Sequence, residues 1–268
     1  MGNPINAQTD DTGLRYYTFN DQRLLSATSL RRVLGMGFGL HNWVISQVVA
    51  GAVAARTDPS TRTMSDEEYS KVVRKAGTMK RDEAASLGTS VHEAAEAGVR
   101  AARLPDTDLR KPYLTQYEAA LAELGIEVLL NEAQVFNLSL GYAGSLDFIG
   151  RATIDVPKYG IKAGDIPLVD LKTGKGIYND HALQLALYYG AEFVGGYDPQ
   201  DDKDVVYVDQ TSILKQTTGA AILHLRPDAW DWVPIPITDE LAAAAVDLTR
   251  LATWFVNHPT LDTLKGVA

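Results

Sequence analysis

The chain has 268 residues, of which 46% are hydrophobic, carries a formal net charge of −9 and contains no cysteine. A chain of this length can bury one sizeable core without requiring a second domain. The lack of cysteine excludes disulfides, thiolate zinc sites, iron–sulfur clusters and a cysteine nucleophile. The acidic balance argues against a protein that coats nucleic acid by bulk electrostatics, although it leaves room for a local basic groove.

The start of the chain predicts a short strand pair followed by helix. Residues 1–14 read as a flexible lead without the apolar core of a secretory signal. Residues 14–28 predict two short strands, and residues 26–55 have helical spacing with a glycine-rich break at 35–39. No run of about 18 apolar residues occurs, so we expect no membrane span.

A second helical region follows a loop. Ser65-Asp66-Glu67-Glu68 has the spacing of a capping box, which predicts a helix that starts there and continues through Lys80 or beyond. Residues 88–96 either start a fresh helix or continue this one, and Pro105 ends it. Residues 112–124 predict a further helix, stopped by Gly125.

The pattern changes to strands in the second half of the chain. Helical spacing interrupts it at 180–193 and returns at 238–256. The expected strands cover residues 127–138, 142–153, 166–171, 205–209, 220–225 and 230–237. We therefore predict one α/β domain over 1–268, in which a mainly helical part (15–125) precedes an α/β core with a C-terminal helix (126–268).

Two of these strands deliver charged side chains directly after apolar residues. Asp170 and Lys172 point to the same face of their strand, and Asp147 lies on the preceding strand. If the two strands form a hairpin, both carboxylates meet at one edge, beside a lysine. This combination suits a hard divalent cation with an activated water. Gly141, Gly144 and Gly174 leave room for close backbone approach or tight turns on either side of the carboxylates.

Two further acidic residues and a histidine are candidates with open alternatives. His92 is as readily a structural histidine as a metal ligand, and Glu96 shares its helical face. The run from His92 to Glu96 almost spells the zinc-protease pattern, but Glu96 stands where the second histidine is needed, so we reject that class. Glu132 is interpreted first as an exposed strand residue and second as a metal ligand.

The helix after the lysine strand carries Gln184 and Tyr188, which are four residues apart and either face the site or simply pack. The run from Lys172 to Lys175 superficially matches a phosphate loop. Gly176 follows Lys175 where that loop needs serine or threonine, so we expect no nucleotide cofactor.

These short motifs occur in an order that is similar to a known superfamily. They are Gly88-Thr-Ser-Val-His92 on a helix, Gly144-Ser-Leu-Asp147, Asp170-Leu-Lys172-Thr-Gly, and Gln184-x-x-x-Tyr188. Over residues 88–190 the chain resembles the RecB-like branch of the PD-(D/E)XK nucleases, near its phage-type and CRISPR-associated exonucleases. It departs from the pattern at Leu146, where the superfamily's name has proline.

The resemblance implies a fold and a set of roles. The fold is the restriction-endonuclease-like core, a mixed central sheet in the order α-β-β-β-α-β. Glu96 and Glu132 have no firm counterpart in the family and are held as supporting candidates. The implied metal ligands are His92, Asp147, Asp170 and the backbone carbonyl of Leu171, with Lys172 orienting the attacking water and Gln184, Tyr188 and Lys175 supporting the site or contacting DNA.

The resemblance also implies a function. It predicts a DNA nuclease that uses magnesium, or manganese in its place, without an iron–sulfur cluster. An exonuclease acting on linear DNA ends in phage or bacterial recombination and repair is the first expectation. A structure-specific endonuclease and a non-catalytic DNA-binding scaffold are the alternatives. A cytoplasmic setting and a strand-annealing partner protein are further expectations of the same origin. A homo-oligomeric ring around DNA is one arrangement that would compensate for a modest basic surface.

Overall fold

The computed structural model describes residues 7–11, 13–19, 21–34, 38–197, 205–207 and 210–258. Its contacts divide the chain into two units, one formed by residues 1–33 with 92–268 and the other by 34–91. In this division the first strands belong to the same unit as the later sheet.

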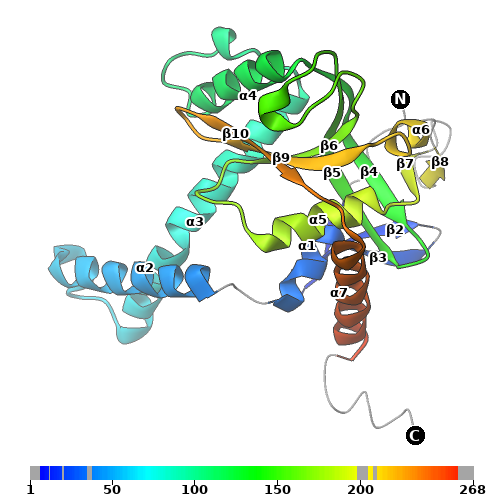
Figure 1. Ribbon diagram of the computed structural model, residues 1–268. Helices are drawn as coiled ribbons and strands as arrows, with labels where there is room; N and C mark the ends of the chain where they lie inside the picture. The colour runs from blue at the N-terminus through cyan, green and yellow to red at the C-terminus, as the bar shows by residue number, and fades with distance from the viewer. Residues whose placement is uncertain are drawn as a thin grey trace, which may run out of the picture. The chain divides into compact units, whose positions relative to one another are not determined.

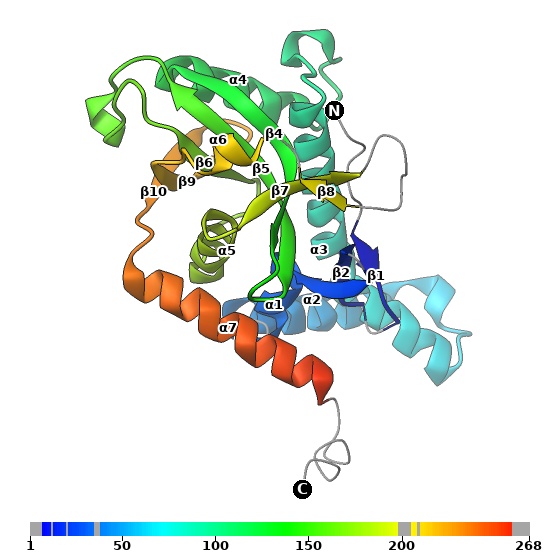
Figure 2. The ribbon, with the colours of Figure 1, turned by 90° about the vertical axis from the view of Figure 1, so that its right-hand side faces the viewer.

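The larger unit is built on a mixed sheet (Figures 1 and 2). The described strands are β1 (Gln8–Thr9), β2 (Arg15–Phe19), β3 (Gln22–Ser26), β4 (Ile126–Asn137), β5 (Tyr142–Ala152), β6 (Pro167–Lys172), β7 (Phe193–Tyr197), β8 (Val205–Tyr207), β9 (Gly219–Leu225) and β10 (Trp230–Ile235). They follow the order β1-β2-β3-β5-β4-β7-β8, and β6, β9 and β10 continue from β5. The β3–β5 and β6–β9 pairs are parallel and the others antiparallel. This confirms the predicted α/β class with a mixed central sheet.

The described helices are α1 (Ala27–Leu30), α2 (Phe38–Thr57), α3 (Asp66–Glu96), α4 (Lys111–Leu124), α5 (Asn179–Tyr189), α6 (Thr211–Leu214) and α7 (Asp239–Asn257). Short 3-10 turns lie at Arg31–Leu34, Pro59–Thr61, Ala101–Arg103 and Pro157–Tyr159. Helix α5 lies between the sheet and α7, as Figure 2 shows, and its Leu185 joins Ile222 of β9 and Leu248 of α7 in the main core. None of the described helices is both long and apolar enough to cross a membrane.

Local hydrogen bonds explain where the first elements begin and end. The predicted strand pair is confirmed as β2 and β3, and part of the expected flexible lead instead forms β1 against β2. The capping box is confirmed: the Glu68 carboxylate accepts from the Ser65 backbone N–H at 2.8 Å, and the Ser65 hydroxyl accepts from the Glu68 N–H at 3.3 Å. From there α3 runs unbroken, so the fresh-helix alternative for 88–96 is wrong.

Glycine ends two of the helices. Helix α3 stops before Pro105, because Gly98 adopts a φ of +63° just past its end. Gly125 ends α4 with a φ of +60°, as predicted. The helix expected over 180–193 already ends at Tyr189, since the chain turns at Gly190 and Phe193 pairs with Phe136 in the sheet. The sequence prediction missed β7 for this reason.

Candidate metal centre

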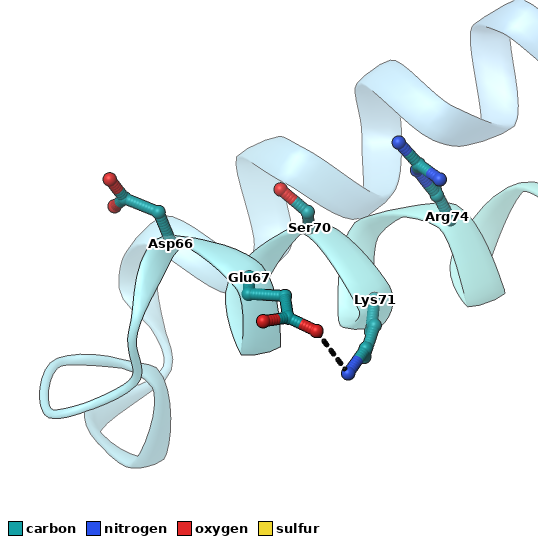
Figure 3. A pocket seen from close by; sticks show the side chains of 5 residues that line it. All are labelled: Asp66, Glu67, Ser70, Lys71 and Arg74. Atoms are coloured by element: carbon teal, nitrogen blue, oxygen red, sulfur yellow. Dashed lines mark ion pairs between the residues drawn. The ribbon is translucent and has the colours of Figure 1, made fainter.

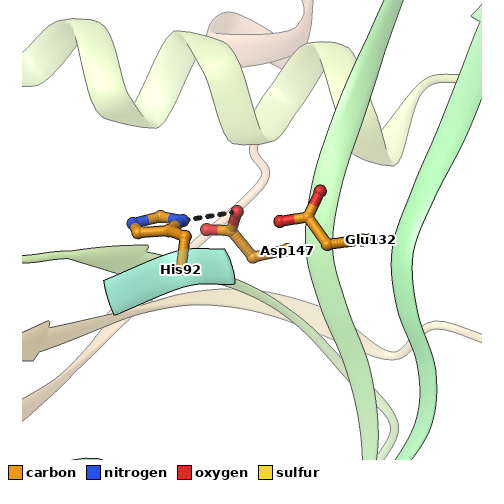
Figure 4. A group of neighbouring side chains, drawn as sticks. All are labelled: His92, Glu132 and Asp147. Carbon is orange, nitrogen blue, oxygen red and sulfur yellow. Dashed lines mark hydrogen bonds and ion pairs between the residues drawn. The ribbon is translucent and has the colours of Figure 1, made fainter. Parts of the chain in front are cut away.

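Three side chains from different elements meet in the larger unit. His92 comes from the last turn of α3, Glu132 from β4 and Asp147 from β5, and their ligand atoms lie within 4.8 Å of one another. Figure 4 shows the carboxylate of Asp147 between the other two side chains. Imidazole nitrogen and carboxylate oxygen are both ligands of divalent cations.

The register of the sheet explains how the carboxylates come together. Asn131 pairs with Phe148 and Ala133 with Leu146, which puts Glu132 of β4 directly across from Asp147. On the other side of β5, Phe148 pairs with Val169, so the same count sets Asp170 of β6 across from Asp147. The predicted approach of the Asp147 and Asp170 strands is therefore confirmed, and a third acidic strand position joins them.

Hydrogen bonds hold the Asp147 carboxylate in place. One oxygen lies 3.0 Å from His92 Nδ1, and the other accepts from the backbone N–H of Leu171 at 2.5 Å. Burial alone would raise the pKa of Asp147, but the charge and hydrogen bond of His92, together with Lys172 and the Leu171 N–H, outweigh burial and lower it. Burial opposes the charged form of His92 too, yet Asp147 raises its pKa above the usual value. Each of the two groups therefore favours the charged form of the other.

Asp170 and Lys172 form a second pair beside this cluster. Asp170 is only 2% exposed, and its carboxylate contacts the Lys172 ammonium. Burial raises the pKa of Asp170, Lys172 opposes this, and the nearby Asp147 charge adds to it, with a net rise. Among the described residues, the ligand atoms that lie within 4.8 Å of one another belong to His92, Glu132 and Asp147. The resemblance had implied Asp170 in this set in place of Glu132. Asp170 is turned to Lys172 instead.

Glu132 is not the exposed strand residue of our first interpretation. Its φ is +45°, an uncommon value for a residue with a side chain, and its carboxylate accepts from the Ser145 hydroxyl at 2.8 Å. Burial and then the Asp147 charge raise the pKa of Glu132 to about 7. The sequence did contain a signal for this position, because counting back through the hairpin turn after Asn137 sets Glu132 opposite Asp147.

Gln184 and Tyr188 lie behind the acidic strands. Gln184 Nε2 donates to the Tyr188 hydroxyl at 2.8 Å, and both side chains are buried. A Cβ at Gly144 would lie 2.4 Å from the Tyr188 ring, so Gly144 provides the close approach that the sequence suggested. A Cβ at Gly174 would meet no atom within 4 Å, and Gly174 instead lies at a bend of the loop after β6. Because Tyr188 is only 2% exposed, its side chain is not open to direct contact with a bound molecule in this structure.

The two remaining predicted residues lie at the surface. Glu96 is exposed at the end of α3, where its backbone carbonyl accepts from the Asn131 side-chain amide at 3.0 Å. Its charge contributes to the raised pKa of Glu132, which fits a supporting role. Lys175 is exposed in the loop between β6 and α5.

A shallow depression in the 34–91 unit has a different character. Figure 3 shows its lining on the first turns of α3, where Glu67 and Lys71 form an ion pair at 2.7 Å. Its lining residues are Asp66, Glu67, Ser70, Lys71 and Arg74. These are solvated side chains of one helix face, and we assign no chemistry to them.

The fold and the cluster define an α/β protein with a candidate carboxylate–imidazole metal centre. No family model matches the chain, and no curated protein is similar to it. A solved structure titled "Crystal structure of SSO0001" matches 53% of this chain with 17% identity and a TM-score of 0.28. The match covers 57% of that protein's own length. This likeness is too weak to identify a fold family.

Proposed function

We propose that the protein is a divalent-metal-dependent DNA nuclease that degrades linear DNA from its ends. The observation that carries the proposal is the meeting of His92, Glu132 and Asp147 within 4.8 Å, beside the Asp170–Lys172 pair. A lysine next to clustered carboxylates suits metal-assisted hydrolysis of a phosphodiester. The motif order over residues 88–190 gives this chemistry its substrate class.

The donor set fits magnesium or manganese. Two carboxylates and an imidazole converge, and a neighbouring carboxyl, Asp170, is also buried. Burial and then the Asp147 charge disfavour the ionised form of Glu132, and a cation bound beside it would favour that form. His92, Glu132 and Asp147 would hold the ion, and the resemblance adds Asp170 and the Leu171 carbonyl to this set. A bound divalent ion would supply an acidified water and would neutralise charge on the phosphate.

The protein's own residues then divide the remaining work. His92 and the Leu171 N–H orient the Asp147 carboxylate from two sides. The Lys172 ammonium, anchored on Asp170, orients the attacking water and stabilises the negative charge that develops on the phosphate. Tyr188 and Gln184 pack behind β5 and fix the strand that carries Asp147.

The order of elements supports the finer prediction of a restriction-endonuclease-like core. Helix α4 is followed by β4, β5, β6, α5 and β7, which is compatible with the α-β-β-β-α-β arrangement that the resemblance implies. A role in phage or bacterial recombination, with a strand-annealing partner in the cytoplasm, remains part of the proposal on the same basis.

Digestion of an end-labelled linear duplex beside a closed circle tests the function. We expect loss of the linear substrate alone, with magnesium but not with EDTA. Asp170→Ala should abolish this loss, whereas Asp247→Ala should not, because Asp247 lies 75% exposed on α7. Cutting of both substrates would instead indicate an endonuclease. DNA binding without cutting under magnesium or manganese would indicate a scaffold and contradict the proposal.

A further inference from the structure

The loop between β6 and α5, which follows Lys172 in the chain, presents an aromatic ring to solvent. This loop begins directly after Lys172, and its last residue, Tyr178, is 63% exposed. Single exposed aromatic residues are common and by themselves indicate nothing. Two further features set Tyr178 apart: its ring packs against neighbours on two sides, and basic side chains lie in and beside its loop.

Contacts on several sides hold the ring and its loop. The Tyr178 ring packs edge-on to the His181 ring with centroids 5.6 Å apart, and the Tyr178 backbone N–H donates to His181 Nδ1 at 3.3 Å. Gly176 lies on another side, where an added Cβ would be 3.4 Å from the Tyr178 hydroxyl. A large ring that is exposed but already oriented loses little conformational entropy when a ligand stacks on it.

A hydrogen-bonded chain also anchors the start of the loop. An arginine can only donate, so Arg226 donates to His224 Nδ1 (3.1 Å), which leaves His224 Nε2 to donate to the Gly174 carbonyl at 2.7 Å. Asp231 pairs with Arg226 in turn. His224 is the β9 partner of Lys172 in the sheet, so the loop is tied to the strand register beside the lysine.

Basic side chains lie in and next to this loop. Burial and then the charge of Lys172 lower the pKa of His181 to about 4; Asp180 opposes this shift, and Arg31 and His224 add to it. Arg31 lies 2.9 Å from Asp180 at the start of α5, and Lys175 extends from the loop itself. An oriented aromatic face among cations is the arrangement that single-stranded nucleic acid binds, through base stacking and phosphate attraction.

We propose that Tyr178 is a stacking platform for a nucleobase of a single-stranded DNA end. This assignment rests on the proposed nuclease function: a base stacked on Tyr178 would bring the adjoining phosphodiester toward Lys172. The substrate class is then a single strand or a frayed duplex end. The platform sorts substrates by strandedness rather than by sequence, because every base has a stacking face.

The test is fluorescence of a single-stranded oligonucleotide with 2-aminopurine near its end, titrated in EDTA so that no cleavage occurs. Wild-type protein should quench the probe. Tyr178→Ala should abolish the quench and weaken binding about tenfold, the effect expected for one stacked base. Tyr178→Phe should keep the quench and bind within about twofold of wild type. Phe255→Ala, which removes another exposed aromatic ring (50% exposed, on α7), should change neither.

Two outcomes separate this inference from the function on which it rests. Equal quenching by wild type and Tyr178→Ala, or no quenching by wild type, would overturn the platform even if wild type digests linear DNA with magnesium. Loss of the quench in Tyr178→Ala from a wild type that digests no DNA would support the platform and overturn the nuclease proposal. Thermal melting of Tyr178→Ala and Tyr178→Phe checks that these variants are folded.

Discussion

Glu132 is the residue whose environment departs most from its sequence interpretation. The pKa of Glu132 rises from 4.5 to about 7 on folding. Between these values the folded state holds a proton that the unfolded state has lost, so stability falls as pH rises, and the loss is complete above pH 7. An ionised Glu132 beside Asp147 therefore destabilises the metal-free protein.

Glu132→Gln removes this charge and keeps an oxygen that can accept from Ser145. We expect the metal-free variant to be more stable than wild type at pH 8, on the order of 1 to 3 kcal/mol, and equally stable at pH 4. Urea unfolding in EDTA at both pH values measures this difference. A variant that is less stable than wild type at pH 8 would show that the charge of Glu132 is well accommodated without metal.

A substitution of Lys172 tests cleavage and metal binding separately. Lys172→Ala should reduce cleavage by more than about a hundredfold, since the group that stabilises developing charge is lost. Manganese affinity should stay within a few-fold of wild type, because lysine is not a ligand. Lys162→Ala, at an exposed position, is the matched control for both assays. Unchanged cleavage by Lys172→Ala would remove Lys172 from the mechanism.

The contact between α5 and β5 decides how firmly the Asp147 strand is held. Tyr188 lies against Gly144, where an alanine Cβ would be 2.4 Å from the ring in a fully buried place. Gly144→Ala should therefore destabilise the protein by about 1 to 3 kcal/mol through overpacking. Gly174→Ala should change stability by less than about 0.5 kcal/mol, because its Cβ would meet open space. Thermal melting compares the two, and equal losses would contradict the packing argument.

Local signals predicted the elements that depend on local contacts. The Ser65 capping box and the Gly125 stop each involve residues within one turn, and both were predicted from sequence. Strand β7 was missed because the helical spacing before it continues to Phe193, whereas its pairing partner Phe136 is far away in the chain. A short strand that depends on a distant neighbour leaves little local signal.

At the scale of the whole molecule, the candidate site depends on the register in which β4, β5 and β6 pair. Asp147, Asp170 and Lys172 were predicted because each directly joins an apolar run. The inclusion of Glu132 and the orientation of Asp170 toward Lys172 depend on how β4, β5 and β6 align, which no single motif specifies. The burial of the Tyr188 side chain likewise depends on how α5 packs on the sheet. The four-residue spacing between Gln184 and Tyr188 does not specify it.

The central claim is that His92, Glu132 and Asp147 together hold one divalent cation. Manganese binding, followed by electron paramagnetic resonance, tests it without reference to any substrate. We predict one tight site in wild type, lost in Glu132→Gln and in Asp147→Asn and kept in Glu96→Gln, whose side chain is exposed. Equal manganese binding by wild type, Glu132→Gln and Asp147→Asn would contradict the account.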